Sequence, residues 1–312
     1  MPRFDVTIAG ELNLDLILYG LPVELPAERE VLADRMMLTL GSSSAIVAHN
    51  LASLGSRVGF QSLVGDDESG QIALKRLAES GVDTSLVRRA RGKQTGLTVI
   101  LQHKHGRNIL TYSGTIAELT LADLDIDYLS DARHFHLSSF YLQRGLRPHI
   151  PELFRRLKAA GLTISLDTND DPEDSWGNLS DVLRNVDVFL PNEREACKIA
   201  GTDDLEVAIE RLAGMVPLVV VKLGTKGAMA RRGDQTTESP SVRVDAVDPV
   251  GAGDSFDAGF LHQYIRGADL ASCLASGNLA GALSTTRSGG TEAFREQEHR
   301  ERFLREHANL TR

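Results

Sequence analysis

The sequence is poor in cysteine and lacks long hydrophobic runs. Cys197 and Cys273 are the only cysteines in 312 residues, and neither belongs to a Cys/His cluster, which argues against a disulfide scaffold and a structural zinc site. The longest apolar run, Val216–Val221, is far too short to span a bilayer, and the chain starts without a signal-peptide pattern. We therefore expect a cytoplasmic protein in a reducing compartment.

The chain also lacks an excess of positive charge. Lys and Arg number 34 against 43 Asp and Glu, which gives a formal net charge of −9. An acidic chain without a long basic run is a poor candidate for binding nucleic acid or an anionic membrane, so we expect a small molecule as its partner. With 42% apolar and 25% charged residues, the composition is typical of a globular protein with a large core.

Short apolar runs alternate with segments of helical periodicity. The pattern predicts strands over residues 6–10, 58–64, 135–137, 163–166, 186–190 and 218–221, and helices over 44–54, 69–80, 151–160, 192–200 and 205–213. Such alternation predicts a parallel sheet with helices on both faces. Two stretches interrupt it: residues 97–112 predict a β-hairpin, and residues 12–39 contain strand-like pieces. We expect residues 12–39 and 94–117 to form a small lid on a core of residues 1–11, 40–93 and 118–312.

The most informative stretch is Asp248–Phe260, which follows a strand-like segment over residues 242–247 and opens a predicted helix. Gly251, Ala252 and Gly253 allow a tight turn and a close approach of the backbone to a ligand. Free N–H groups and the dipole at a helix start favour an anion there, such as a phosphoryl group in transfer. Asp254, in the same turn, is suited to accept a proton from an attacking hydroxyl.

The same residues are also compatible with purely structural roles. A glycine-rich turn with an acidic residue that complements the helix dipole would give the same pattern. A dinucleotide fingerprint is disfavoured, because Phe256 stands where a third small residue is needed, and no P-loop Gly-Lys-Ser/Thr is present here. Asn192 and Glu195, three residues apart at a helix start, are typical of a capping-box variant.

Asp248–Phe260 resembles the C-terminal signature of the ribokinase-like (PfkB-type) carbohydrate kinases. The resemblance extends over nearly the whole chain, through Gly10–Asp15, Gly41–Gly55, Val64–Gly70, Asp167–Asn169, Asn192–Glu195 and Lys222–Gly227. It implies a three-layer α/β/α Rossmann-like core with a small β-strand lid, in agreement with the alternation above. It also implies ATP and Mg²⁺ as the nucleotide and its ion, and a homodimer formed through the lid.

The resemblance assigns roles to individual residues. Asp254 would be the catalytic base, and Gly251, Ala252 and Gly253 would form the anion hole. The sugar site would comprise Asn13, Asp15, Gly41, Ser42 and Ser43. The ATP site would comprise Asn192, Glu195, Lys222, Gly224, Thr225, Gly227 and Asn278. Glu195 would hold Mg²⁺ through water, and Asp248 would lie at the monovalent-cation site that some members use for K⁺.

Several positions depart from the family pattern. Ser42 replaces the second glycine of a Gly-Gly pair, Ile46 replaces an asparagine that often contacts the sugar, and a threonine is frequent in place of Lys222. The arginine that often follows Asn169 is absent, which disfavours a carboxylate or phosphate on the acceptor. Ala293 stands where a serine ligand of K⁺ can occur, so we expect weak or no activation by K⁺.

These observations predict an enzyme that phosphorylates a hydroxyl of a small, uncharged sugar with ATP. A nucleoside kinase of the same fold is an alternative that the lid and Ile46 would decide. A non-catalytic sugar- or nucleotide-binding regulator is an alternative of another class, against which the intact Gly251, Gly253 and Asp254 argue.

Overall fold

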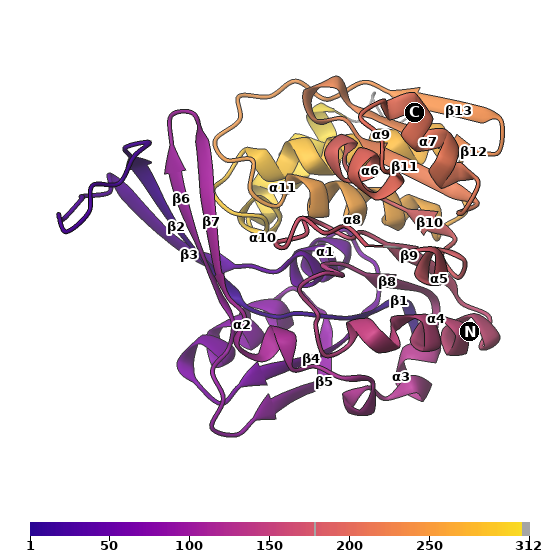
Figure 1. Cartoon of the computed structure of the whole chain (residues 1–312), viewed down its shortest axis with the longest axis horizontal. Helices are drawn as coiled ribbons and strands as arrows, with labels where there is room; N and C mark the ends of the chain where they lie inside the picture. The colour runs from indigo at the N-terminus through magenta and orange to yellow at the C-terminus, as the bar shows by residue number, and fades with distance from the viewer. Residues whose placement is uncertain (178, 308–312) are drawn as a thin grey trace.

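A computed structural model describes residues 1–177 and 179–307 and contains a large central sheet with a smaller one beside it (Figure 1). The large sheet has nine strands in the order β13-β12-β11-β10-β9-β8-β1-β4-β5. Its strands are β1 (Phe4–Ala9), β4 (Val58–Gly65), β5 (Asp83–Ala90), β8 (Ala132–Leu137), β9 (Thr163–Leu166), β10 (Val188–Phe189), β11 (Leu218–Lys222), β12 (Ala228–Arg232) and β13 (Gln235–Ser239). From β5 to β11 the strands pair in parallel, as predicted. At the other end of the sheet β12 pairs antiparallel with both β11 and the edge strand β13, which the alternation did not predict.

Helices cover both faces of the large sheet and enclose two apolar clusters. One face carries α1 (Ser43–Ser53), α2 (Glu68–Glu79), α8 (Ala252–Tyr264) and α9 (Leu270–Thr285). The other carries α3 (Ile126–Ser130), α4 (Ile150–Ala159), α5 (Ser180–Leu183), α6 (Glu193–Ala200) and α7 (Leu205–Ala213). The short helices α10 (Glu292–Arg295) and α11 (Gln297–Glu306) pack on α9. The three-layer α/β/α architecture is therefore present. No helix in the two described ranges is both long and apolar enough to cross a membrane.

The smaller sheet has the order β3-β2-β6-β7 and projects from the body as a lid (Figure 1). Its strands are β2 (Leu14–Leu21), β3 (Arg35–Leu40), β6 (Leu97–His103) and β7 (Gly106–Tyr112). The segment that leads into β6 is tied to the body by Asp67, which caps α2 through the Gly70 N–H (2.9 Å) and accepts hydrogen bonds from the Thr95 N–H (2.9 Å) and hydroxyl (2.6 Å). The Val64–Gly70 stretch thus anchors the base of the lid.

The predicted strand over residues 242–247 is absent from the structure, where this segment has no regular secondary structure. Val242 and Val244 alternate with polar residues, as in a half-buried strand, but they pack against the cluster formed by α9, α10 and α11. The period-two pattern arises from contact with helices, and no neighbouring strand pairs with the segment.

A chain of polar side chains runs through the interior of the large sheet beneath α8. His134 and His136 on β8 alternate with Ser165 on β9, which lies 2.7 Å from a ring nitrogen of each. At one end the Thr163 hydroxyl lies 2.7 Å from His134 Nδ1, and at the other end the Ser138 hydroxyl lies 2.7 Å from His136 Nε2. Burial lowers the pKa of each imidazole to about 3, so both rings are neutral at physiological pH. We call these five side chains the His/Ser ladder.

Candidate active site

The Asp248–Gly251 turn brings α8 to the centre of the molecule. Gly251 has φ 72°, in the left-handed region, and a Cβ there would lie 2.5 Å from Cα of Gly290. Both the conformation and the space therefore require glycine. The turn ends at Ala252, where α8 begins without a side-chain cap; the Ala252 N–H donates to the Pro249 carbonyl (3.3 Å), and the Gly253 N–H has no partner outside the helix among the described residues. Gly251, Ala252 and Gly253 thus lie together at a helix start, where the sequence predicts an anion site.

Asp254 lies in the first turn of α8 and is buried, with an exposed fraction of 8%. Burial first, and the charge of Asp167 second, raise the pKa of its carboxyl group, while Lys222 acts in the opposite direction. The Asn169 side-chain amide lies 3.4 Å from Asp254 Oδ1. A buried carboxylate with a raised pKa, held by a neighbouring amide, is suited to receive a proton.

Asp15 and Gly41 face one another at the base of the lid. A Cβ on Gly41 would lie 2.0 Å from Asp15 Oδ1, so any side chain at position 41 would displace the carboxylate. Burial, followed by the negative charges of Asp254 and Asp248, raises the pKa of Asp15 to about 7. Within residues 1–177 and 179–307 no donor is hydrogen-bonded to this buried carboxylate. A buried acceptor without a protein donor is the group that a bound hydroxyl would satisfy.

Ser42, which replaces a family glycine, has φ 69°. A serine in the left-handed region is strained, so its neighbours must hold it there. Its hydroxyl donates to Asn13 Oδ1 and accepts a hydrogen bond from the Asn13 N–H at 2.9 Å. Ser42 and Asn13 therefore brace each other, and the remaining Asn13 amide hydrogens point to the Leu14 carbonyl (3.0 Å) and Thr98 (3.5 Å).

Ile46 is buried in α1, with its Cδ1 3.3 Å from the position of a Gly251 Cβ and 2.7 Å from that of a Gly290 Cβ. It therefore packs against the backbone of the anion-binding turn. This position agrees with a core role for Ile46, the alternative to a sugar contact. Ser43 opens α1 beside Asp254, and its side chain contributes to lowering the pKa of that carboxyl group.

A cavity of about 700 Å³ extends from the start of α8 along the 241–246 segment. Of the residues predicted to bind ATP, it is lined by Lys222, Gly224, Thr225, Gly227 and Asn278, and Ala252 and Gly253 of the anion hole complete one end. Asn278 donates from Nδ2 to the carbonyls of Ser239 (3.0 Å) and Pro240 (3.1 Å), which holds the cavity wall to α9. The size and the free N–H groups at one end suit a nucleotide with its phosphates on α8.

Lys222 places a buried ammonium group at the α8 end of this cavity. Its Nζ lies 2.7 Å from Asp167 Oδ2 and 3.2 Å from both oxygens of Asp257, whose side chains are fully buried. It also lies 3.7 Å from the position of a Cβ on Gly253. The two carboxylates outweigh the effect of burial and raise the pKa of Lys222, so it remains charged. An ammonium group has three donors, and these three oxygens occupy them, so a ligand would have to replace one of the two longer contacts with Asp257.

Asn192 and Glu195 form a complete capping box at the start of α6. Asn192 Oδ1 accepts from the Glu195 N–H (2.9 Å), and the Glu195 carboxylate accepts from the Asn192 N–H (2.8 Å) and Nδ2 (2.6 Å). Neither residue lines the 700 Å³ cavity. An isolated bridge between Asn192 and Lys222 nevertheless brings the box beside the ammonium group.

No three His, Cys, Asp or Glu side chains in residues 1–177 and 179–307 are grouped so as to hold a metal ion by themselves, so a divalent cation here would depend on waters and phosphates as well as on single carboxylates. Burial and the charge of Asp167 raise the pKa of Glu195 to about 7, and the pKa values of Asp254 and Asp257 are raised as well. These carboxyl groups lie near the ammonium of Lys222 and outnumber it, which gives this part of the site an excess of acidic groups. Carboxylate oxygens are the ligands Mg²⁺ prefers, and it usually retains waters and binds substrate phosphates.

Asp248 has a different environment. Its Oδ1 accepts from the Val250 N–H (3.0 Å) and Gln102 Nε2 (3.2 Å), and its Oδ2 from the Tyr19 hydroxyl (2.5 Å) and the Gly289 N–H (3.1 Å). These four donors match the four lone pairs of a carboxylate. A monovalent cation would bind this side chain only by displacing one of them.

Sequence reasoning missed three side chains at this site. Arg243 lines the nucleotide-sized cavity from the segment expected to be a strand. Tyr19 and Gln102 reach Asp248 from the lid, 229 and 146 residues away in the chain. No local pattern marks such distant contacts.

Residues 3–297 match the profile described as pfkB family carbohydrate kinase. A sugar kinase of Archaeoglobus fulgidus, described as uncharacterised, is 31% identical over 246 residues, covering 78% of this chain and 97% of its own. The 2-dehydro-3-deoxygluconokinase of Bacillus subtilis is 30% identical over 280 residues, 85% of this chain and 86% of its own. Among solved structures, a ribokinase II of Escherichia coli in complex with ATP and Mg²⁺ is 25% identical, with TM-score 0.83 over 97% of this chain and all of that one.

Proposed function

This chain belongs to the pfkB family of carbohydrate kinases, and from that premise we propose that it transfers the γ-phosphoryl group of ATP to a hydroxyl of a small, uncharged sugar, with Asp254 as the base. One observation carries the proposal: Asp254 lies in the first turn of α8, where its charge acts on the buried carboxylate of Asp15 and its chain neighbour Gly253 lines the nucleotide-sized cavity. A hydroxyl bound at Asp15 and a phosphate bound at the start of α8 would meet at Asp254.

The proposed reaction needs one proton acceptor and one anion site. The sugar oxygen forms a bond to the γ-phosphorus, the bond from that phosphorus to the β–γ bridging oxygen breaks, and ADP leaves. The hydroxyl proton passes to the Asp254 carboxylate. The N–H groups of Gly251 and Gly253, with that of Ala252 once it leaves the Pro249 carbonyl, would balance the negative charge on the phosphoryl oxygens, so positioning and electrostatics would supply most of the rate.

The nucleotide would occupy the 700 Å³ cavity along Gly224, Thr225, Gly227 and Asn278. Lys222 would meet the phosphate end, beside Gly253, by exchanging one of its two contacts with Asp257 for a phosphate oxygen. Glu195, positioned by the capping box, would hold Mg²⁺ through water, and the ion would neutralise phosphate charge. The lid would exclude water, which competes with the sugar as acceptor.

An uncharged sugar suits the charges around the substrate site. Asp15, Asp254 and Asp248 are close enough that the latter two raise the pKa of Asp15. Such a negative site disfavours an acceptor with a carboxylate or a phosphate. The positive charge of Arg107, on β7, lowers the pKa of Asp15 and so opposes the effect of the two carboxylates. An acidic sugar is therefore the most informative compound to compare with a neutral sugar in an assay.

A homodimer through the lid is part of the proposal. Asp15, Ile17 and Tyr19 alternate along β2 with residues that face away from the site. On that outer face, the strand registers place Leu16, Val99 and Leu110 in one apolar row across the sheet, and Leu38 continues the row to the core of the body, against which it packs. Covering this row with the lid of a second copy would remove apolar surface from water. Sedimentation of the native chain and of Leu110→Glu at matched concentrations tests it, and a monomeric native chain would contradict it.

The test of the proposed reaction is ADP release with ATP, Mg²⁺ and a panel of neutral sugars, acidic sugars, sugar phosphates and nucleosides. We expect a neutral monosaccharide to give the highest kcat/KM, and mass spectrometry to detect its monophosphate. A nucleoside as the best acceptor would favour the alternative of a nucleoside kinase. Acceptance of phosphorylated sugars alone would contradict this description of the pocket.

A further inference from the structure

Asp248 joins the lid to the anion-binding turn. Two of its four hydrogen-bond donors, the Val250 and Gly289 N–H groups, belong to the backbone around the turn. The other two, the Tyr19 hydroxyl and the Gln102 amide, belong to strands β2 and β6 of the lid. The carboxylate is buried, so each donor meets it away from water.

The backbone that Asp248 holds is the backbone that shapes the anion site. Val250 immediately precedes Gly251, and Gly289 precedes Gly290, whose Cα lies 2.5 Å from where a Cβ of Gly251 would be. Gly251 adopts the left-handed region without strain, so its own conformation does not fix the position of the turn, which the contacts of the neighbouring backbone determine. A shift of the Asp248 carboxylate would therefore move both stretches of backbone that define the turn.

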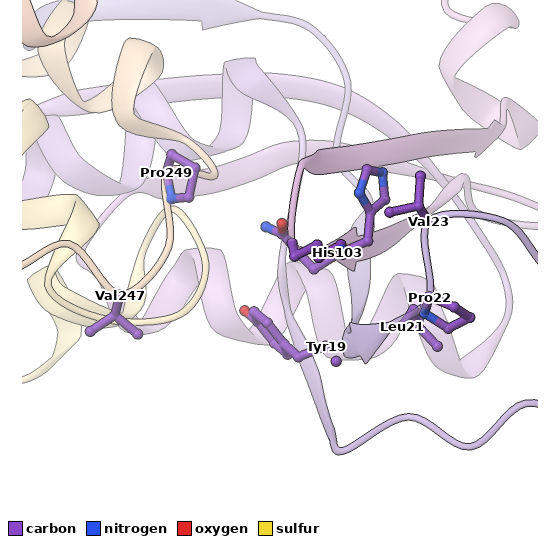
Figure 2. A pocket seen from close by; sticks show the side chains of 10 residues that line it. Tyr19, Leu21, Pro22, Val23, His103, Val247 and Pro249 are labelled. Atoms are coloured by element: carbon purple, nitrogen blue, oxygen red, sulfur yellow. The ribbon is translucent and has the colours of Figure 1, made fainter.

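Tyr19 is itself held in position on the lid. Arg35, its cross-strand neighbour on β3, places its guanidinium carbon 4.0 Å from the centre of the Tyr19 ring. Burial first, and the bond to Asp248 second, raise the pKa of the hydroxyl, which therefore stays protonated and donates. Figure 2 shows Tyr19 between the lid residues Leu21–Val23 and the loop carrying Val247 and Pro249, across a cavity of about 460 Å³.

The lid strand that carries Tyr19 also carries Asp15, on the same face of the sheet. A ligand hydroxyl bound by Asp15 and the bond from Tyr19 to Asp248 therefore depend on the same placement of β2. We propose that Tyr19 and Gln102 are positioning residues through which the seated lid sets the shape of the anion-binding turn, so that occupancy of the substrate site orders the phosphoryl site. This inference rests on the proposed function for its link to catalysis, but the structural coupling stands apart from it.

The test uses the full-length chain with Tyr19→Phe, Gln102→Leu and the double substitution. Tyr112→Phe is the matched control, because it removes a tyrosine hydroxyl from the same lid sheet, where the partner is Gln94 (3.2 Å). Two quantities are measured: hydrogen exchange of peptides covering residues 247–252 and 286–291, and steady-state kinetics with the best acceptor of the panel.

Without any ligand, we expect Tyr19→Phe to speed exchange in these two peptides and the double substitution to speed it further, with the rest of the chain and Tyr112→Phe unchanged. The acceptor should slow exchange in both peptides of the native chain and lose that effect in the double variant. In kinetics, kcat should fall about tenfold for Tyr19→Phe, as a lost charge-assisted hydrogen bond implies, with much smaller changes in the KM values.

Native exchange in both peptides of the double variant would overturn the inference, and so would faster exchange spread evenly over the chain, since that marks a general loss of stability. A fall in kcat equal to that of Tyr112→Phe would also overturn it. If no compound in the panel is phosphorylated, the proposed function fails, whereas the ligand-free exchange comparison still decides the coupling.

Discussion

Replacing Asp254 by asparagine should lower activity and raise stability in the same protein. Asparagine has almost the same shape and keeps an oxygen near Asn169, 3.4 Å away in the native chain, but it can neither accept the substrate proton nor carry charge. Loss of a general base typically costs about 10²–10⁴ in rate, so kcat should fall by that factor. ATP affinity should change little, because the anion site is built from backbone N–H groups.

The gain in stability follows from the direction in which the protein moves the pKa of Asp254. This pKa is higher in the folded protein than its ordinary value, because burial and Asp167 disfavour the charged form. A carboxyl group of this kind lowers the free energy of unfolding as the pH rises from its pKa in the unfolded chain to its pKa in the folded protein. The loss is about 1.4 kcal/mol for every tenfold difference between the two acid dissociation constants. Asp254→Asn should therefore be more stable than the native chain at pH 8, and the difference should close as the pH falls to about 4.

The assay combines ADP release with urea unfolding at pH 8 and at acid pH. Asp245→Asn, an exposed acid in the segment before the turn, is the control and should change neither kcat nor stability. Near-native turnover of Asp254→Asn would refute its role as the base. Equal or lower stability at pH 8 would refute the electrostatic reasoning, even if activity were lost.

The remaining predictions concern the sugar, the nucleotide, the cation and the core. Asp15→Ala should raise the KM for the sugar about ten- to a hundredfold and leave the KM for ATP nearly unchanged; an unaltered sugar KM would show that the carboxylate does not contact the acceptor. Lys222→Met should lower the free energy of unfolding by about 3–5 kcal/mol, measured by urea titration, because it leaves buried carboxylates without their ammonium partner; stability equal to that of the native chain would contradict this. Exchanging Na⁺ for K⁺ in the ADP assay should change the rate little, and a many-fold rise would contradict it. Ser165→Ala should cost about 1–3 kcal/mol for each of the two imidazole nitrogens it leaves buried without a partner, and a neutral effect would show that water replaces the hydroxyl.

The alternation of strands and helices was predictable because each periodicity has one physical cause, the burial of one face. The predicted α7 coincides with residues 205–213 of the structure, where an apolar stripe faces the sheet and Asp204 caps the helix. The error over residues 242–247 has the same origin, since packing on α9 gave Val242 and Val244 the period of a strand. Periodicity reports that one face is buried, but not what buries it.

The site was predictable where it depends on a local motif. Gly251 and Asp254 lie in one helix turn, and five of the residues expected to bind ATP line one cavity. The contacts of Asp248 with the lid lay beyond prediction, because Tyr19 and Gln102 have no pattern that links them to a distant turn. Such contacts arise only when the two sheets are placed against each other.

The His/Ser ladder has a direction as well as a position. A neutral imidazole that donates from one ring nitrogen accepts at the other, so each ring passes the direction of one contact on to the next. The Ser165 hydroxyl has one hydrogen, so it donates to one of the two rings and accepts from the other.

The four contacts can therefore all be made in only two arrangements, one the reverse of the other: both rings donate from Nδ1, or both donate from Nε2. In either arrangement the two rings are the same tautomer and all of these dipoles point the same way, and His134 contacts Tyr264 of the helix that carries Asp254. Reversing the ladder would require every hydrogen in it to move together, so this part of the interior has a single polarity, which ¹⁵N chemical shifts of the two rings would report.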